Sequence, residues 1–129
     1  MLPTVAMLPP NLRSLLVALG TSLALTIVLT WPLAITTGTA RLPFCDSLFS
    51  GWVLSWGAHA LTSAPATLPD GNIFWPDRDA LFYGPAAFGA LLWYTPIYVL
   101  TGDPVRALNL TYLLCFTLTG ATAHWVVWR

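Results

Sequence analysis

Two long apolar runs lie near the ends of the chain, and a more polar stretch separates them. Residues 15–37 and residues 108–128 contain no Asp, Glu, Lys or Arg. As helices that rise about 1.5 Å per residue, they measure about 34 Å and about 31 Å, and the hydrocarbon core of a bilayer is about 30 Å thick. Each run is therefore long enough to cross a membrane, and the pattern predicts two transmembrane helices.

The first run has a second interpretation, which is a cleaved signal peptide. Its apolar part exceeds the signal-peptide core of about 7–15 residues, and no clear A-x-A cleavage site follows it. Trp31 lies near the end of the first run, and Trp125 and Trp128 lie near the end of the second. Aromatic residues at helix ends are typical of membrane–water interfaces. We therefore expect the first run to be an uncleaved span.

The stretch between the runs, residues 38–107, holds all five aspartates and three of the five arginines. A helix is expected over residues 46–62, where Asp46, Ser50 and Gly57 point away from an aromatic stripe. At about 100° per residue, that stripe consists of Leu48, Phe49, Trp52, Trp56 and Ala60. Such a helix lies in the headgroup region or packs on other protein. Residues 63–79 contain Pro65, Pro69, Gly71 and Pro76 and are expected to be irregular.

Residues 81–100 are apolar for about the length of a span, but prolines interrupt them. Gly84-Pro85 breaks the start of this run and Pro96 interrupts its end. We expect an interfacial or re-entrant helix at about 86–100, with a third span as the alternative. Two spans place both chain ends on one side of the membrane, whereas three place them on opposite sides. Positive charges do not decide the topology, because arginines flank both ends of the spans.

Composition strengthens the membrane assignment, because 57% of the residues are hydrophobic and 8% are charged. An average soluble domain is about one quarter charged. The predicted fold class is an all-α membrane protein, with two transmembrane helices enclosing an extracytoplasmic loop with interfacial helices. Its parts are a tail at 1–14, a first span at 15–37, the loop at 38–107 and a second span at 108–129. The formal net charge is zero, so no basic field attracts nucleic acid.

The two cysteines, Cys45 and Cys115, fall in different environments, one in the loop and one in the second span. We therefore expect small apolar side chains rather than a disulfide. Their spacing to histidine does not suggest a metal site, and no cofactor motif is present. The sequence thus predicts neither a metal nor a cofactor.

One carboxylate, Asp46, lies a few residues beyond the first span, in the sequence Arg41-Leu-Pro-Phe-Cys-Asp46-Ser. An acid at the membrane surface is well placed to act as a general base on a lipid-linked molecule. The alternative is structural, because aspartate is a favoured helix N-cap. Residue chemistry alone leaves both interpretations open.

The order of these features resembles the amino-terminal part of bacterial polytopic glycosyltransferases of the GT-C superfamily, which includes mannosyltransferase and arabinosyltransferase relatives. The first matching stretches run from Cys45 to Phe49 and from Trp52 to Leu61. The others are Asn72 to Pro76, Tyr83, and Thr101 to Val105 followed by Asn109-Leu110. The resemblance covers most of the chain, and its motifs consist mainly of aromatic residues, prolines and one acid. It implies a multi-pass protein of the bacterial cytoplasmic (inner) membrane.

The resemblance also implies a reaction and a set of candidate residues. In such enzymes an aspartate close to the first span accepts the proton of an acceptor hydroxyl, and Asp46 occupies that position here. The activated oxygen attacks a sugar carried on polyprenyl phosphate, the phosphate leaves from the opposite face, and the configuration inverts. A second carboxylate is not required, because a phosphate needs less protonation than a sugar alkoxide. His59 is a candidate contact to the phosphate or the base, and Asn72, Asp77 and Asp79 are candidates for an acceptor path.

The chain departs from these enzymes in length, because they have many more spans and the later helices build the donor pocket. We therefore expect an incomplete segment that is inactive alone and works with the remainder of the enzyme or with another subunit. The alternative is a small non-enzymatic membrane protein or accessory subunit. A pore or transporter is disfavoured, because charges inside spans usually mark such pathways and both runs lack them.

Overall fold

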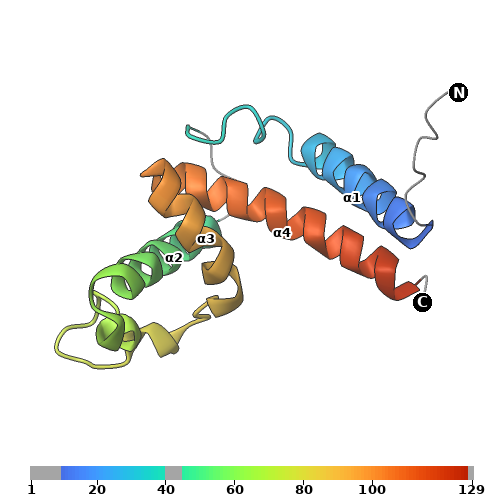
Figure 1. Ribbon diagram of the computed structural model, residues 1–129. Helices are drawn as coiled ribbons and strands as arrows, with labels where there is room; N and C mark the ends of the chain where they lie inside the picture. The colour runs from blue at the N-terminus through green and yellow to red at the C-terminus, as the bar shows by residue number, and fades with distance from the viewer. Residues whose placement is uncertain (1–9, 40–44, 128–129) are drawn as a thin grey trace, which may run out of the picture.

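The computed structural model describes residues 10–39 and 45–127. Within these residues the protein is entirely helical and contains no strand (Figure 1). This confirms the predicted all-α class. The four α-helices are α1 (Pro10–Leu29), α2 (Cys45–Ser63), α3 (Phe88–Thr101) and α4 (Pro104–Val127), and two short 3₁₀ helices are η1 (Pro65–Asp70) and η2 (Ala80–Tyr83).

Helices α1 and α4 lie antiparallel along each other (Figure 1). Ser14 Oγ is 3.0 Å from His124 Nε2, so the start of α1 lies beside the last turns of α4. Near the middle of the pair the backbones approach closely, because a Cβ atom added to Gly120 would lie 2.6 Å from Ser22 Oγ. Both helices are long and apolar enough to cross a membrane, over Leu12–Leu29 and Pro104–Val127.

The first long helix ends at Leu29, although the apolar run continues to residue 37. Proline at position 32 has no N–H and cannot continue the helical hydrogen bonds. Residues 30–39 instead form successive turns, including a hydrogen bond from Leu33 N to Thr30 O of 2.9 Å. The segment is held against α4 by the buried Asn109, whose Nδ2 donates to Thr37 O at 2.7 Å.

Helices α2 and α3 pack against the first half of α4. Their shared core consists of Leu54, Ala58, Leu91, Tyr94, Ala107 and Leu108. Helices α2 and α3 approach closely at Gly57, since a Cβ atom there would lie 2.8 Å from a methyl carbon of Leu91, whose side chain would have to shift. The core face of α2 is therefore built from aliphatic residues and glycine rather than from its aromatic residues.

The aromatic stripe of α2 packs on the irregular loop that follows it. A Cβ atom on Gly84 would lie 2.9 Å from Phe49 Cζ. The indole Nε1 of Trp56 donates to Leu68 O at 3.1 Å, and that of Trp52 donates to Asn72 Oδ1 at 2.7 Å. Trp52 and Trp56 of the stripe therefore contact other parts of the protein, whereas Leu48 and Phe49 remain exposed.

A tight connection joins α3 to α4. Helix α3 has 14 residues, which is about 21 Å of helix and too short to cross a bilayer. Gly102 ends it with a positive φ of 64° and donates its N–H to Tyr98 O. Asp103 then caps α4, because its Oδ1 accepts hydrogen bonds from Val105 N at 2.9 Å and Arg106 N at 3.1 Å.

Loss of this cap should destabilise the protein measurably. We expect Asp103→Ala to lower the free energy of unfolding by about 0.5–2 kcal/mol, because two N–H groups of the first turn of α4 lose their acceptor. Asp103→Asn is the control, because asparagine keeps the acceptor oxygen and removes the charge. Thermal unfolding in detergent micelles measures both, and equal losses in the two variants would show that charge rather than capping matters.

Candidate functional site

Asp46 is the second residue of α2, and its side chain is exposed. It therefore lies inside the first turn and not at the residue that precedes the helix. A carboxylate in the first turn is favoured by the positive end of the helix dipole. Arg41, which precedes Asp46 in the sequence, lies outside the described residues. The structure thus presents Asp46 to the surroundings at the amino end of α2.

A groove of about 210 Å³ runs between α2 and α4, next to the turn that carries Asp46. Asp46 does not line this groove, but the next two residues in the chain do. Tyr94 borders the same region, because its buried hydroxyl lies 2.8 Å from Ser55 Oγ, and Ser55 is a lining residue. The lining is Ser47, Leu48, Gly51, Trp52 and Ser55 from α2, and Pro104, Val105 and Leu108 from α4.

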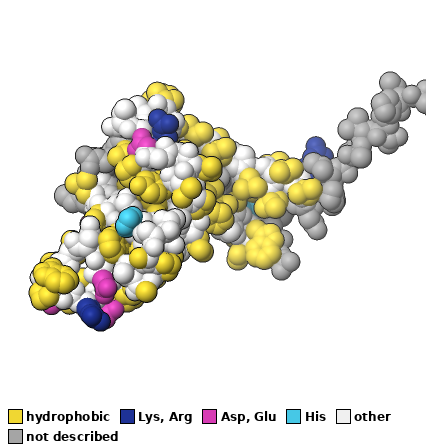
Figure 2. Space-filling model, turned by 60° about the vertical axis from the view of Figure 1, so that its left-hand side comes forward, with side chains coloured by type: hydrophobic (Ala, Val, Ile, Leu, Met, Phe, Trp, Pro, Cys, Tyr) yellow, Lys and Arg dark blue, Asp and Glu magenta, His cyan; other side chains and the backbone are white. Residues whose placement is uncertain are grey.

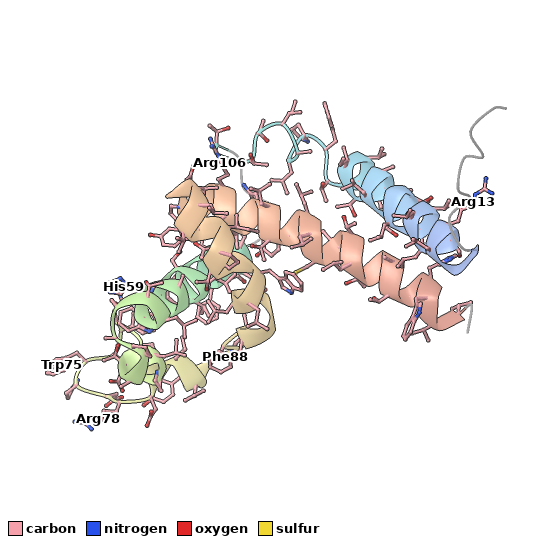
Figure 3. The ribbon with its side chains drawn as sticks, viewed as in Figure 1. Arg13, His59, Trp75, Arg78, Phe88 and Arg106 are labelled. Atoms are coloured by element: carbon pink, nitrogen blue, oxygen red, sulfur yellow. The ribbon has the colours of Figure 1, made fainter. Side chains whose placement is uncertain are left out.

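His59 lies far from Asp46. His59 is 13 positions further along α2, which corresponds to a helical rise of about 20 Å. It is exposed near the carboxyl end of the helix (Figure 3), where its Nε2 is 3.4 Å from Ser63 Oγ and its ring is 5.9 Å from that of Trp56. This distance argues against direct contact between His59 and the carboxylate of Asp46.

Asn72 is hydrogen-bonded to α2, the helix that carries Asp46. Its Oδ1 accepts the 2.7 Å hydrogen bond from Trp52, which is about 9 Å along α2 from Asp46. Trp52 also lines the groove between α2 and α4. Trp52 therefore connects the groove on one side with Asn72 on the other.

Asp77 and Asp79 lie in the exposed loop and not beside Asp46. Asp77 Oδ2 accepts a hydrogen bond from Tyr83 Oη at 3.3 Å, and Asp79 N donates to Asp70 Oδ1 at 3.3 Å. Arg78, between them, points outward (Figure 3). The arrangement is that of a solvated turn with local hydrogen bonds.

The charge of Asp77 acts on its tyrosine neighbour. Coulombic repulsion from this carboxylate raises the pKa of Tyr83, with smaller contributions from desolvation and from the hydrogen bond itself. We expect Asp77→Asn to shift the ionisation of one tyrosine to lower pH, since tyrosinate no longer forms beside a negative charge. Ultraviolet titration of tyrosinate measures the shift, and Asp70→Asn is the control. Identical titration curves for the wild type and Asp77→Asn would contradict the pairing.

Sequence reasoning missed the hydroxyl pair inside the helical core. Tyr94 is fully buried, and its Oη lies 2.8 Å from Ser55 Oγ and donates to Pro104 O at 3.4 Å. The signal for it was a tyrosine in the middle of an apolar run, where an interfacial aromatic residue is not expected. This pair joins α2, α3 and the start of α4 beneath the groove.

No protein-family model, curated protein or solved structure matches the chain. Among residues 10–39 and 45–127, no group of three or more His, Cys, Asp or Glu side chains is placed to hold a metal ion. The candidate site therefore consists of one exposed acid, a small groove with two serines, and a tryptophan–asparagine pair. Such a site can accept a proton and bind a polar group beside an apolar surface.

Proposed function

We propose that the chain is the amino-terminal segment of an integral membrane glycosyltransferase of the GT-C type. It acts in the bacterial cytoplasmic membrane and moves a sugar from polyprenyl phosphate to an acceptor hydroxyl. Asp46 is its general base. The observation that carries the proposal is an exposed carboxylate in the first turn of a helix that packs on α4, next to a groove between these two helices.

The surface of the α1–α4 pair supports membrane insertion. Leu16, Val17 and Val28 of α1 are exposed, as are Val126 and Val127 of α4. Exposed apolar surface of this extent is costly in water and favourable in lipid. Within the described residues no Asp, Glu, Lys or Arg lies in α1 beyond Arg13 or in α4 beyond Arg106. The bilayer is therefore the partner that suits this pair.

The outer face of α3 supports an interfacial or re-entrant position. Phe88, Leu92 and Val99 lie on one side of the helix and are exposed, whereas Leu91 and Tyr94 lie on another face and are buried. The spacing of 4 and 7 residues places the first three on a common face. Because α3 is too short to span, an apolar outer face suits a helix that lies partly in lipid.

The proposed chemistry assigns the main role to Asp46. Its carboxylate takes the proton of the acceptor hydroxyl while the acceptor oxygen forms a bond to the anomeric carbon. The bond between that carbon and the phosphate oxygen breaks, and the polyprenyl phosphate leaves with the electron pair. Asn72 is positioned by its hydrogen bond to Trp52 and is a candidate for the acceptor path. His59 stays a candidate contact to the phosphate, and Asp77 and Asp79 stay candidates for the acceptor path.

A transfer assay tests this function. Membranes that express the whole reading frame containing this chain are incubated with radiolabelled polyprenyl-phosphate sugars from a bacterial lipid extract. We expect label in a new glycan product, and no transfer from membranes that contain residues 1–129 alone. Absence of transfer with the whole frame, at verified expression, would favour the accessory-subunit alternative.

A further inference from the structure

Four aromatic side chains are exposed together at the end of the loop. We call this group the aromatic tip, and it consists of Phe74, Trp75, Phe82 and Tyr83. Trp75 is 93% exposed and the other three are more than half exposed. Figure 2 shows hydrophobic side chains gathered at one end of the molecule with acidic and basic side chains beside them. Exposed aromatic surface of this kind is typical of a binding surface.

The tip is held outward by the packing beneath it. Ala80 and Leu81 of η2 are each 2% exposed, so the two following residues of the same short helix turn away from the core. The rings of Phe74 and Tyr83 lie 5.8 Å apart and support each other. A fixed arrangement of this kind loses little conformational entropy when the rings are buried by a partner.

The tip continues into the exposed face of α3. The rings of Phe82 and Phe88 meet edge to face with centroids 6.1 Å apart. From Phe88 the exposed apolar surface runs along α3 through Leu92 and Val99 towards the start of α4. Helix α2 and the loop extend to one side of the α1–α4 pair (Figure 1). The surface that begins at the tip is therefore continuous with the surface assigned to lipid.

We propose that the aromatic tip inserts into the headgroup region of the same bilayer that α1 and α4 cross. This inference rests on the proposed membrane insertion. Trp and Tyr prefer that depth because their rings are apolar and their N–H and O–H groups reach water. Asp77, Arg78 and Asp79 are exposed beside the tip and remain on the aqueous side. A lipid interface accommodates both groups, whereas a protein pocket would have to pair the charges.

Insertion of the tip gives α2 a second attachment to the membrane. Helix α2 packs on α4 near its amino end and on η1 near its carboxyl end, and η1 contacts η2. With α4 in the bilayer and the tip at its surface, α2 is held at two points. The aromatic tip therefore acts as a positioning element that fixes the depth of Asp46 relative to lipid headgroups.

Spin labels in phosphatidylcholine nanodiscs test this inference. The chain is purified with Cys45→Ser and Cys115→Ala, and a label is attached through Phe82→Cys, which leaves Trp75 in place. We expect the label to have a high accessibility to oxygen, because oxygen concentrates in lipid. Its accessibility to a water-soluble nickel chelate should be low. Adding Trp75→Ala should raise nickel access at position 82. Thr67→Ala, at an exposed position of η1, is the matched control and should not change it.

A second label separates this inference from the membrane proposal. Val28→Cys in α1 reports on the span itself, since Val28 is exposed on its surface. If position 28 is in lipid and position 82 is fully aqueous, the tip does not insert although the protein does. If both positions are aqueous, the membrane insertion on which the inference depends is wrong. A label at 82 that is immobile but aqueous would indicate contact with a protein or a second copy, and would also overturn the inference.

Discussion

Replacement of Asp46 by asparagine should abolish sugar transfer by the complete protein while leaving its membrane insertion intact. General-base catalysis typically contributes about 10²–10⁴-fold to a rate, and we expect a loss of that size. Asparagine has nearly the same shape as aspartate and cannot accept the proton of an acceptor hydroxyl. Since Asp46 is exposed in the first turn of α2, the substitution leaves no buried group without a partner. The loss should therefore appear mainly in the rate, because the stability changes only by the lost interaction with the helix dipole, about 0.3–1 kcal/mol.

Asp70→Asn is the matched control for this experiment, because it removes one carboxylate from the same loop, has no role in the proposed site and keeps an acceptor oxygen for Asp79 N. We expect it to retain most of the transfer activity. Initial rates are compared at equal amounts of protein in the membrane, measured by immunoblot. Full activity of Asp46→Asn would remove Asp46 from the role of base. Equal losses in both variants would indicate a general requirement for negative charge in the loop.

Replacement of Gly120 by leucine should separate α1 from α4. Close approach of helices in membranes depends on small residues at the crossing point. At Gly120 a Cβ atom would lie 3.0 Å from the Cβ atom of Ser22, and rotation of the serine hydroxyl cannot relieve that contact. We expect the free energy of unfolding to fall by about 1–3 kcal/mol, the usual cost of overpacking. Thermal unfolding in micelles, followed by circular dichroism, measures the change.

Gly20→Leu is the control for Gly120→Leu, because nothing lies within 4 Å of a Cβ atom at Gly20. Both substitutions replace glycine inside a long helix, so both gain the same helix propensity of about 1 kcal/mol. The difference between the two variants therefore isolates the packing at the crossing. Equal stabilities of the two variants would contradict the antiparallel contact between α1 and α4.

The existence of the long helices was predictable from the sequence, but the end of the first one was not placed correctly. Hydropathy is a property of side chains, and the apolar run continues past Trp31 to residue 37. The helix ends earlier because Pro32 lacks an N–H group, and the following turns are fixed by Asn109, which is distant in sequence. The pattern of apolar residues along the sequence carries no information about such a long-range contact. The start of α3 was predicted within two residues, because Pro85 lies just before it, whereas the expected interruption at Pro96 was wrong, since the helix continues through Pro96 and ends at Gly102.

The arrangement of the candidate site was less predictable. The stripe of α2 was recognised, but the loop that covers it folds back through contacts such as Gly84 against Phe49. These contacts depend on tertiary packing and leave no periodic signal. The distance between His59 and Asp46 could be predicted from the sequence, because both lie on one helix and the rise per residue is known. The pairing of Asn72 with Trp52 required the path of the loop, which the turn residues do not specify.

The proposed function requires that the loop between α1 and α4 lies on one side of the membrane. Both chain ends must then lie on the other side. Labelling of intact cells with a membrane-impermeant maleimide tests this most directly. The variant carries Ser63→Cys, Cys45→Ser and Cys115→Ala, with a second reactive cysteine in a tag after Arg129 as the matched site. We predict labelling at position 63 in intact cells and labelling of the tag only after the cells are opened. Labelling of both sites in intact cells, or of neither, would contradict the account.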